Sequence, residues 1–169
     1  PTNVISITDG QIFLESELFF EGQRPAVNIG LSVSRVGGNA QTKAVKKAVG
    51  SLRLDLAQYR EMEVFMQFAG DLDALTRKQL FYGQGLMRLL RQPQYKPYSQ
   101  AEEVVLLVCA LGHVMENVSP SGINAFANGL IAWMKEQHPD FFKEIESTCE
   151  LTPELKQRIL AAAADYRAK

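Results

Sequence analysis

From residue 41 to the end of the chain, apolar residues recur every three or four positions, and no strand-like segment interrupts them. This spacing puts apolar side chains along one face of an α-helix. Prolines and capping residues divide the region, because a proline disfavours helix at the residue before it. The predicted helices span residues 41–68, 74–91, 99–116, 120–137, 141–147 and 153–168. Five or six consecutive helices without intervening strands predict a mainly α fold, built as a helical bundle.

Local signals predict several helix ends. Ser99 and Glu102 have the spacing of a capping box, and Thr152 followed by Pro153 is typical of a cap and a first helical turn. The helix predicted at 41–68 includes Gly50, which costs about 1 kcal/mol relative to alanine in an exposed helix. We expect one continuous helix there, because the apolar spacing continues across the glycine.

The N-terminal region has a different pattern. Val4–Thr8 and Gln11–Leu14 are typical of short strands on either side of an Asp9–Gly10 turn, and Pro25–Val36 is typical of extended chain. Two short strands are only marginally stable by themselves, so we expect the rest of their sheet to lie elsewhere. The chain also begins without methionine and enters a strand directly. We therefore expect it to be a piece of a longer protein.

Arg35 lies in a run of mainly small and apolar residues, 25–41, that contains no other charged residue. The alternation of Ser32 and Ser34 with apolar residues indicates an extended segment, and Gly37–Gly38 indicates a sharp turn or a close approach of the backbone. A guanidinium is planar, forked and always charged, so a fixed one beside such a glycine pair suits a phosphate oxygen. The alternative is a surface arginine paired with a carboxylate, and the segment alone leaves it open.

A second polar feature is Gln92-Pro93-Gln94, which lies between two predicted helices. A glutamine amide offers a donor and an acceptor together, which suits the edge of an adenine ring, and the proline restricts where the amides point. Arg24–Pro25, before the serine segment, is a comparably unusual pair. An exposed interhelical turn is the alternative interpretation of Gln92–Gln94, and the residues by themselves leave it open.

Composition and missing motifs exclude several functions. A formal net charge of −1 gives no electrostatic reason to expect nucleic acid, and the apolar runs are too short for a membrane-inserted helix. The sequence lacks a glycine-rich phosphate-binding loop ending in Gly-Lys, a nucleophile elbow and a zinc-protease motif. We predict no metal site and no turnover by this chain alone. Asp71 and Asp73 are interpreted as helix-capping residues rather than as metal ligands.

Four segments of the sequence are distinctive when taken together: Val4–Ile12 (VISITDGQI), Arg24–Gly38 (RPAVNIGLSVSRVGG), Ser51–Arg60 (SLRLDLAQYR) and Asp71–Ala74 (DLDA). Together they closely resemble the α subunit of F-type rotary ATP synthases. The resemblance is dense over residues 1–98 and rests on a compatible helical pattern beyond them. It implies that residues 1–38 are a short β/extended remnant of a nucleotide-binding domain. This remnant would hold the terminal strands and the arginine-finger segment of that domain. Residues 39–169 would form the C-terminal helical domain.

In that family three α and three β subunits alternate around a rotating γ stalk, with nucleotide at every interface. The resemblance implies that Arg35 is the arginine that α inserts into the catalytic site of a neighbouring β subunit. It also implies that Ser32 is a signature serine that holds the segment aiming Arg35. The loop Asp71–Ala74 would face the γ stalk. Five residues would form the wall around the adenine of the α subunit's own, non-catalytic nucleotide: Arg24, Pro25, Gln92, Pro93 and Gln94.

The function implied by the resemblance is that of a regulatory, non-catalytic subunit in a complex that makes or hydrolyses ATP, coupled to proton or sodium flow. The implied cofactors are ATP or ADP with Mg in the parent complex, with no tight binding to this chain alone. The implied partners are β subunits, the γ stalk, and the peripheral stalk with δ. The expected location is the cytoplasmic face of a bacterial plasma membrane, or an organellar inner or thylakoid membrane. Two alternatives are a helical interaction module unrelated to nucleotide and a subunit of a vacuolar-type or export ATPase.

Overall fold

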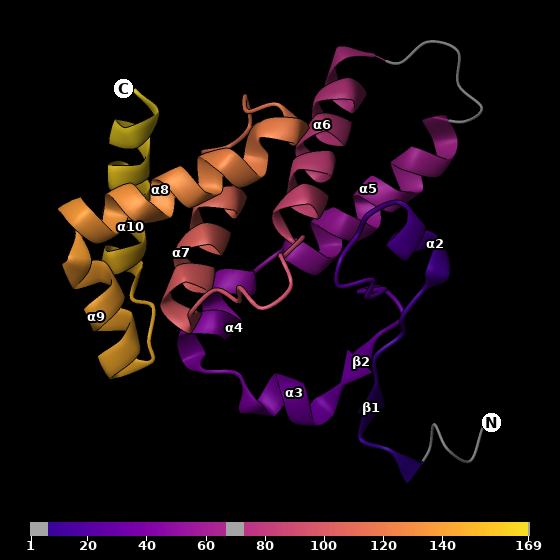
Figure 1. The fold of residues 1–169 in the computed structure, drawn as a ribbon, viewed down its shortest axis with the longest axis horizontal. Helices are drawn as coiled ribbons and strands as arrows, with labels where there is room; N and C mark the ends of the chain where they lie inside the picture. The colour runs from indigo at the N-terminus through magenta and orange to yellow at the C-terminus, as the bar shows by residue number, and fades with distance from the viewer. Residues whose placement is uncertain (1–6, 67–72, 169) are drawn as a thin grey trace.

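The computed structural model describes residues 7–66 and 73–168, and the fold is mainly helical (Figure 1). The N-terminal part contains β1 (Gly10–Gln11), α2 (Ser16–Phe20), β2 (Val33–Ser34) and α3 (Arg35–Ala40). The bundle that follows contains α4 (Lys43–Val49), α5 (Leu52–Met66), α6 (Ala74–Leu89), α7 (Gln100–Leu111), the 3-10 turn η1 (Pro120–Gly122), α8 (Ile123–Gln137), α9 (Pro139–Thr148) and α10 (Pro153–Arg167). The predicted fold class, a helical bundle after a short extended region, is confirmed.

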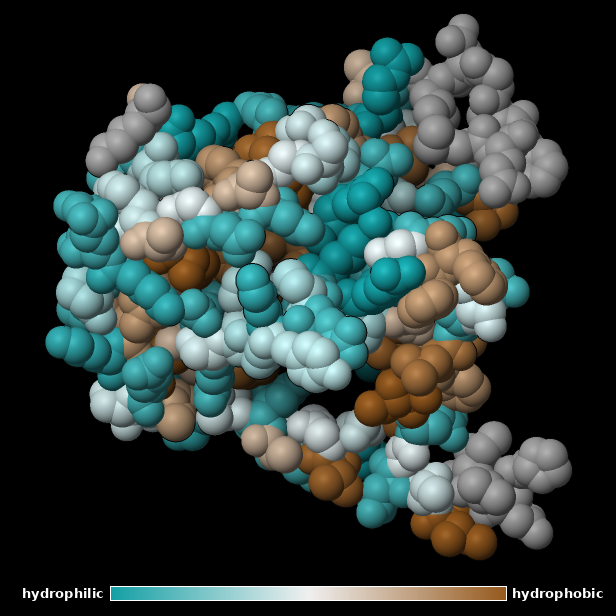
Figure 2. All heavy atoms as spheres, in the orientation of Figure 1, coloured by the Kyte–Doolittle hydropathy of each residue, from teal (hydrophilic) through white to brown (hydrophobic). Residues whose placement is uncertain are grey.

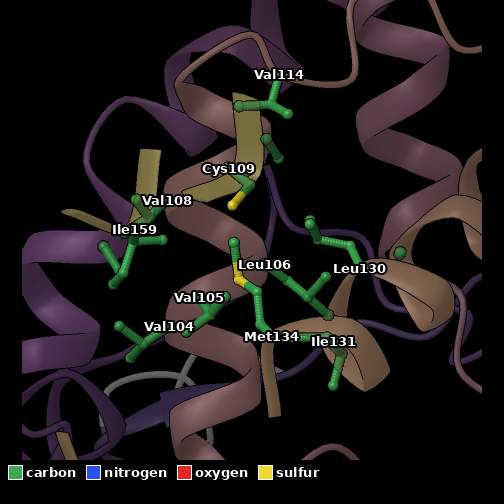
Figure 3. Packing of buried hydrophobic residues seen from close by; sticks show 14 of the residues in the cluster. Val104, Val105, Leu106, Val108, Cys109, Val114, Leu130, Ile131, Met134 and Ile159 are labelled. Carbon is green, nitrogen blue, oxygen red and sulfur yellow. The ribbon is translucent and has the colours of Figure 1, made fainter. Parts of the chain in front are cut away.

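Helix α7 lies at the centre of the bundle. After its first turn its sequence is apolar on every side, and a helix of that kind has to be covered all round. Helices α4, α8, α9 and α10 all contact it. Figure 3 shows Val104 and Cys109 of α7 in one core with Leu130 of α8 and Ile159 of α10. Burial of these apolar side chains is the main stabilising contribution to the bundle.

Two of the predicted helix caps are present. The Ser99 hydroxyl accepts a hydrogen bond from the Glu102 N–H at 3.3 Å, and the Glu102 carboxylate accepts one from the Ser99 N–H at 2.5 Å. This reciprocal pair is the predicted capping box. Thr152 caps α10 by accepting a hydrogen bond from the Leu155 N–H at 3.1 Å. These ends could be predicted because each involves residues only three positions apart.

The prediction of one helix over 41–68 is wrong. Two helices, α4 and α5, meet at Gly50, whose φ is +42°. Glycine reaches positive φ without strain because it has no Cβ, so Gly50 ends a helix instead of lying inside one. Helix α7 stops at Leu111 rather than at 116, since the next residues leave helical geometry and His113 has a φ of +59°.

The N-terminal strands differ in part from the prediction. Most of the expected strand Val4–Thr8 falls outside the described residues, and its described residues 7 and 8 are not in a strand. β1 and β2 pair antiparallel, with Gly10 opposite Ser34. Leu14 forms an isolated bridge with Val27. The predicted extended run therefore includes a paired strand, but it ends at Ser34, because α3 begins at Arg35.

The N-terminal part is held differently from the bundle. Among the described residues before Ala44, only Gln23 and Asn28 are buried, and both are polar. From Ala44 onward the buried side chains are apolar. Large apolar side chains of the N-terminal part, such as Phe20 and Leu14, are exposed, and Figure 2 shows apolar surface gathered there. Hydrogen bonds, together with the partly buried Ile29 that packs against the bundle core, therefore attach this part to the helices.

The two cysteines are free thiols in opposite environments. Cys109 is fully buried in α7, and burial raises the pKa of its thiol to about 12, so the thiolate is scarce at about pH 8. Cys149 is exposed at the end of α9. We expect a disulfide reagent at about pH 8 to modify one thiol in the native chain and both thiols after denaturation.

A Cys149→Ser variant is the control for this experiment, and it should show no fast-reacting thiol while native. Two fast-reacting thiols in the native wild-type chain would contradict the buried position of Cys109.

Candidate functional site

The five residues predicted to surround an adenine meet at one cleft. Arg24 and Pro25 come from the loop after α2, and Gln92–Gln94 come from the loop after α6. The Gln92 N–H donates a hydrogen bond to the Arg24 carbonyl at 2.9 Å, which joins the two loops. The cleft has a volume of about 940 Å³. The structure therefore brings together two sequence segments that the prediction could only pair by resemblance.

The cleft walls combine apolar faces with amide groups. Leu14, Phe19 and Tyr95 line it together with the prolines, and the Arg24 guanidinium lies 4.4 Å from the centre of the Phe19 ring. Tyr95 is almost fully exposed, whereas Phe19 is half exposed and has the Arg24 guanidinium over its ring. Flat apolar surface edged by a few polar groups is typical of sites that bind a heteroaromatic ring.

Arg91 and Gln23 join the same two loops a second time, next to the residues that line the cleft. The Arg91 Nε donates a hydrogen bond to the buried Gln23 Oε1 at 3.0 Å, and its Nη2 donates to the Glu21 carbonyl at 3.3 Å. Burial and the nearby Arg88 lower the pKa of Arg91, which still leaves it a cation. Sequence reasoning missed both residues. The available signal was their position in the sequence, since Gln23 directly precedes Arg24–Pro25 and Arg91 directly precedes Gln92–Gln94.

Arg35 is the first residue of α3 and is not part of the cleft lining. Its N–H donates a hydrogen bond to the Asp9 carbonyl at 3.1 Å, and the preceding Ser34 pairs with Gly10. The Ser34 hydroxyl caps α3 by accepting from the Gly37 N–H at 2.9 Å. The Arg35 side chain is exposed. None of the ion pairs found among residues 7–66 and 73–168 involves Arg35.

The glycine pair Gly37–Gly38 lies within α3, so of the two predicted alternatives, a sharp turn or a close approach, the sharp turn is wrong. Gly37 is nevertheless a position of close approach, since a Cβ there would lie 2.7 Å from the Ser34 hydroxyl oxygen. A Cβ added at Gly38 would meet no other atom within 4 Å. The first glycine therefore permits the cap that begins the helix of Arg35.

Ser32 ties the chain before β2 to the chain after β1. Its hydroxyl donates to the Asn28 carbonyl at 2.5 Å and accepts from the Phe13 N–H at 3.1 Å. A hydroxyl that bridges two backbone groups fixes the local path of both segments. Ser32 is thus placed to hold the segment that leads into Arg35.

Sequence reasoning also missed Asn28, Arg53 and Arg60. Asn28 is buried, and the two arginines reach from α5 to it and to its neighbouring carbonyls. The available signal was spacing, because Arg53 and Arg60 are two helical turns apart and share one face of α5.

Only half of the predicted loop Asp71–Ala74 can be compared, because its first two residues lie outside the described residues. Asp73 is the N-cap of α6 and accepts a hydrogen bond from the Thr76 N–H at 2.6 Å. Hydrogen bonds from Thr76 lower the pKa of the Asp73 carboxyl. The predicted capping role of Asp73 is confirmed.

In the described ranges, no three histidine, cysteine or acidic side chains are grouped so that they could hold a metal ion. Nor does any helix in this part of the chain have the length and apolar content to cross a bilayer.

Two family descriptions match the chain. Residues 41–166 match the ATP synthase alpha/beta chain, C terminal domain. Residues 1–34 match the ATP synthase alpha/beta family, nucleotide-binding domain. The first match runs from just before α4 into the last turn of α10, and the second includes β1, α2 and β2.

Proposed function

The chain belongs to the ATP synthase alpha/beta family, and from that premise we propose that it is part of a non-catalytic α subunit of an F-type ATP synthase. In this proposal residues 1–38 complete a nucleotide-binding domain and residues 39–169 form the helical domain. The parent complex makes or hydrolyses ATP and couples this reaction to ion flow. The alternative of a helical module unrelated to nucleotide does not agree with the two family matches.

The observation that carries the proposal is the way Arg35 is attached. Its backbone is fixed by the Asp9 carbonyl, by the β1–β2 pairing and by the Ser34 cap, while its side chain is exposed. A forked cation on a fixed base is suited to stabilising charge that develops on a phosphoryl group held by a neighbouring subunit. Ser32 supports the same segment through its two hydrogen bonds.

The cleft supports the second part of the proposal, a nucleotide bound by its base. Gln92 and Gln94 supply amides, and Phe19 and Pro25 supply apolar surface. The described residues of the cleft fit an adenine but include no acidic cluster for a metal ion. ATP or ADP with Mg would therefore be held through its phosphates elsewhere in the parent complex.

The partners in this proposal are β subunits on either side, the γ stalk near the loop before α6, and the peripheral stalk with δ. The complex would be bound at the cytoplasmic face of a bacterial plasma membrane, or at an organellar membrane, with this chain outside the bilayer.

The isolated 169-residue chain is expected to bind nucleotide only weakly. Because the cleft contacts the base alone, adenosine and ATP should bind with similar dissociation constants, on the order of 1 mM or weaker. Titration calorimetry with each ligand measures this. Tight binding of ATP, with adenosine much weaker, would mean that this chain contains the phosphate site and that the cleft has been assigned wrongly.

Turnover by the assembled complex with Arg35 replaced tests the main proposal. A large loss in a complex of normal composition would support the finger role, and unchanged turnover would remove it.

A further inference from the structure

Asn28 is a buried polar residue at the centre of a hydrogen-bond network. It is 6% exposed, and its Nδ2 donates to the Glu15 Oε1 at 2.7 Å. Its Oδ1 accepts from the Leu31 N–H at 3.1 Å and from the Arg60 Nη1 at 2.7 Å. A buried amide is stable only when such partners are present, because burying it without hydrogen bonds costs free energy. We call Asn28, Glu15, Ser32 and Arg60 the Asn28 network.

Arg60 is the member of this network that comes from the bundle. It lies on α5, and Arg53 on the same face places its Nη2 3.4 Å from the carbonyls of Ile29 and Ser32. The Arg60 contact is the shorter one, it joins a charged donor to a buried acceptor, and it belongs to the stronger class of hydrogen bonds. Helix α5 packs against α6, so Arg60 connects the bundle to the N-terminal part.

The network continues from Asn28 to Arg35. The Asn28 carbonyl accepts hydrogen bonds from the N–H and the hydroxyl of Ser32, at 3.0 and 2.5 Å. Ser32 directly precedes β2, and β2 directly precedes Arg35. Among the described residues of this part no apolar side chain is fully buried, although Ile29 is partly buried against the bundle core. The hydrogen bonds supply the directional contacts that fix the path of the segment.

From this geometry we propose that Arg60 is a positioning residue for Arg35. It acts through Asn28 to fix the segment that carries the Arg35 guanidinium, and it makes the position of that guanidinium depend on the position of α5. This inference rests on the proposed function, in which Arg35 acts on a nucleotide held by a neighbouring subunit.

Arg60→Ala in the assembled complex is expected to lower kcat about 10- to 100-fold, since a displacement of about 1 Å at a reacting centre costs up to that factor. KM should change by less than about threefold, because the nucleotide is gripped by another subunit. Arg60→Lys should restore part of the rate, since its ammonium can still donate to the Asn28 Oδ1. Arg158→Ala is the matched control. That arginine pairs on the surface with Asp140 and Glu144, and its loss should leave kcat unchanged.

A double-mutant cycle with Arg35→Ala decides whether Arg60 acts through Arg35. Phosphate release from radiolabelled ATP is measured for the wild type, each single variant and the double variant. The inference predicts that Arg60→Ala causes no further loss of kcat once Arg35 is absent. An equal loss in both backgrounds, or no loss in either, would overturn the inference and leave the finger role intact. Unchanged turnover in Arg35→Ala itself would overturn the proposed function, and the inference with it.

Discussion

Replacing Arg35 with lysine is expected to lower the turnover of the assembled complex by about a thousandfold or more. Arginine fingers contribute about 10³ to 10⁵ in rate as a class, and lysine keeps the charge but loses the fork that engages two oxygens together. The α3 segment should keep its position, because neither the Arg35 N–H to Asp9 carbonyl bond nor the Gly37 N–H to Ser34 hydroxyl bond uses the Arg35 side chain. Steady-state ATP hydrolysis at saturating nucleotide measures the effect.

Subunit composition is the first control for this experiment, since a complex that fails to assemble also loses activity. Arg158→Lys, on the exposed face of α10, provides a matched substitution that should leave turnover unchanged. A normal complex with wild-type turnover after Arg35→Lys would contradict the finger role.

Replacing Leu130 with alanine is expected to reduce the free energy of unfolding by about 2 to 5 kcal/mol. Leu130 is fully buried where α8 packs against α7. The substitution removes apolar contacts and leaves a cavity, because the surrounding helices can collapse only in part. Guanidinium unfolding of the chain, followed by circular dichroism, measures the change in midpoint.

Leu54→Ala is the matched control, because Leu54 lies on α5 and is 60% exposed. We expect a change within about 0.5 kcal/mol there. Equal destabilisation by both substitutions would contradict the conclusion that Leu130 is buried in the core between α7 and α8.

The helices could be predicted where the signal was local. The capping box of Ser99 and Glu102, the Thr152 cap and the apolar sequence of α7 each depend on residues within a few positions of one another. Gly50 shows the limit of such signals. A glycine inside an apolar repeat is compatible with a continuous helix or with a break, and tertiary packing decides between them.

The candidate site could be predicted only in part, because its residues come from distant segments. Resemblance suggested that Arg24 and Gln92 share a site, and the hydrogen bond between their backbones joins the two loops. Asn28 could not have been selected from the sequence. A lone asparagine in an apolar segment is ordinary until Arg60 is seen to donate to its side chain.

The attachment of the N-terminal part by buried amides has a thermodynamic consequence. Separating Gln23 and Asn28 from Arg91 and Arg60 would expose less apolar surface than unfolding the bundle, since Ile29 is only partly buried there, so the accompanying heat-capacity change should be small. Unfolding of the bundle exposes the whole apolar core around α7, so its heat-capacity change is large. Warming or cooling would therefore change the stability of the bundle along a curved profile, while the free energy that holds the arginine segment to the bundle changes almost linearly with temperature.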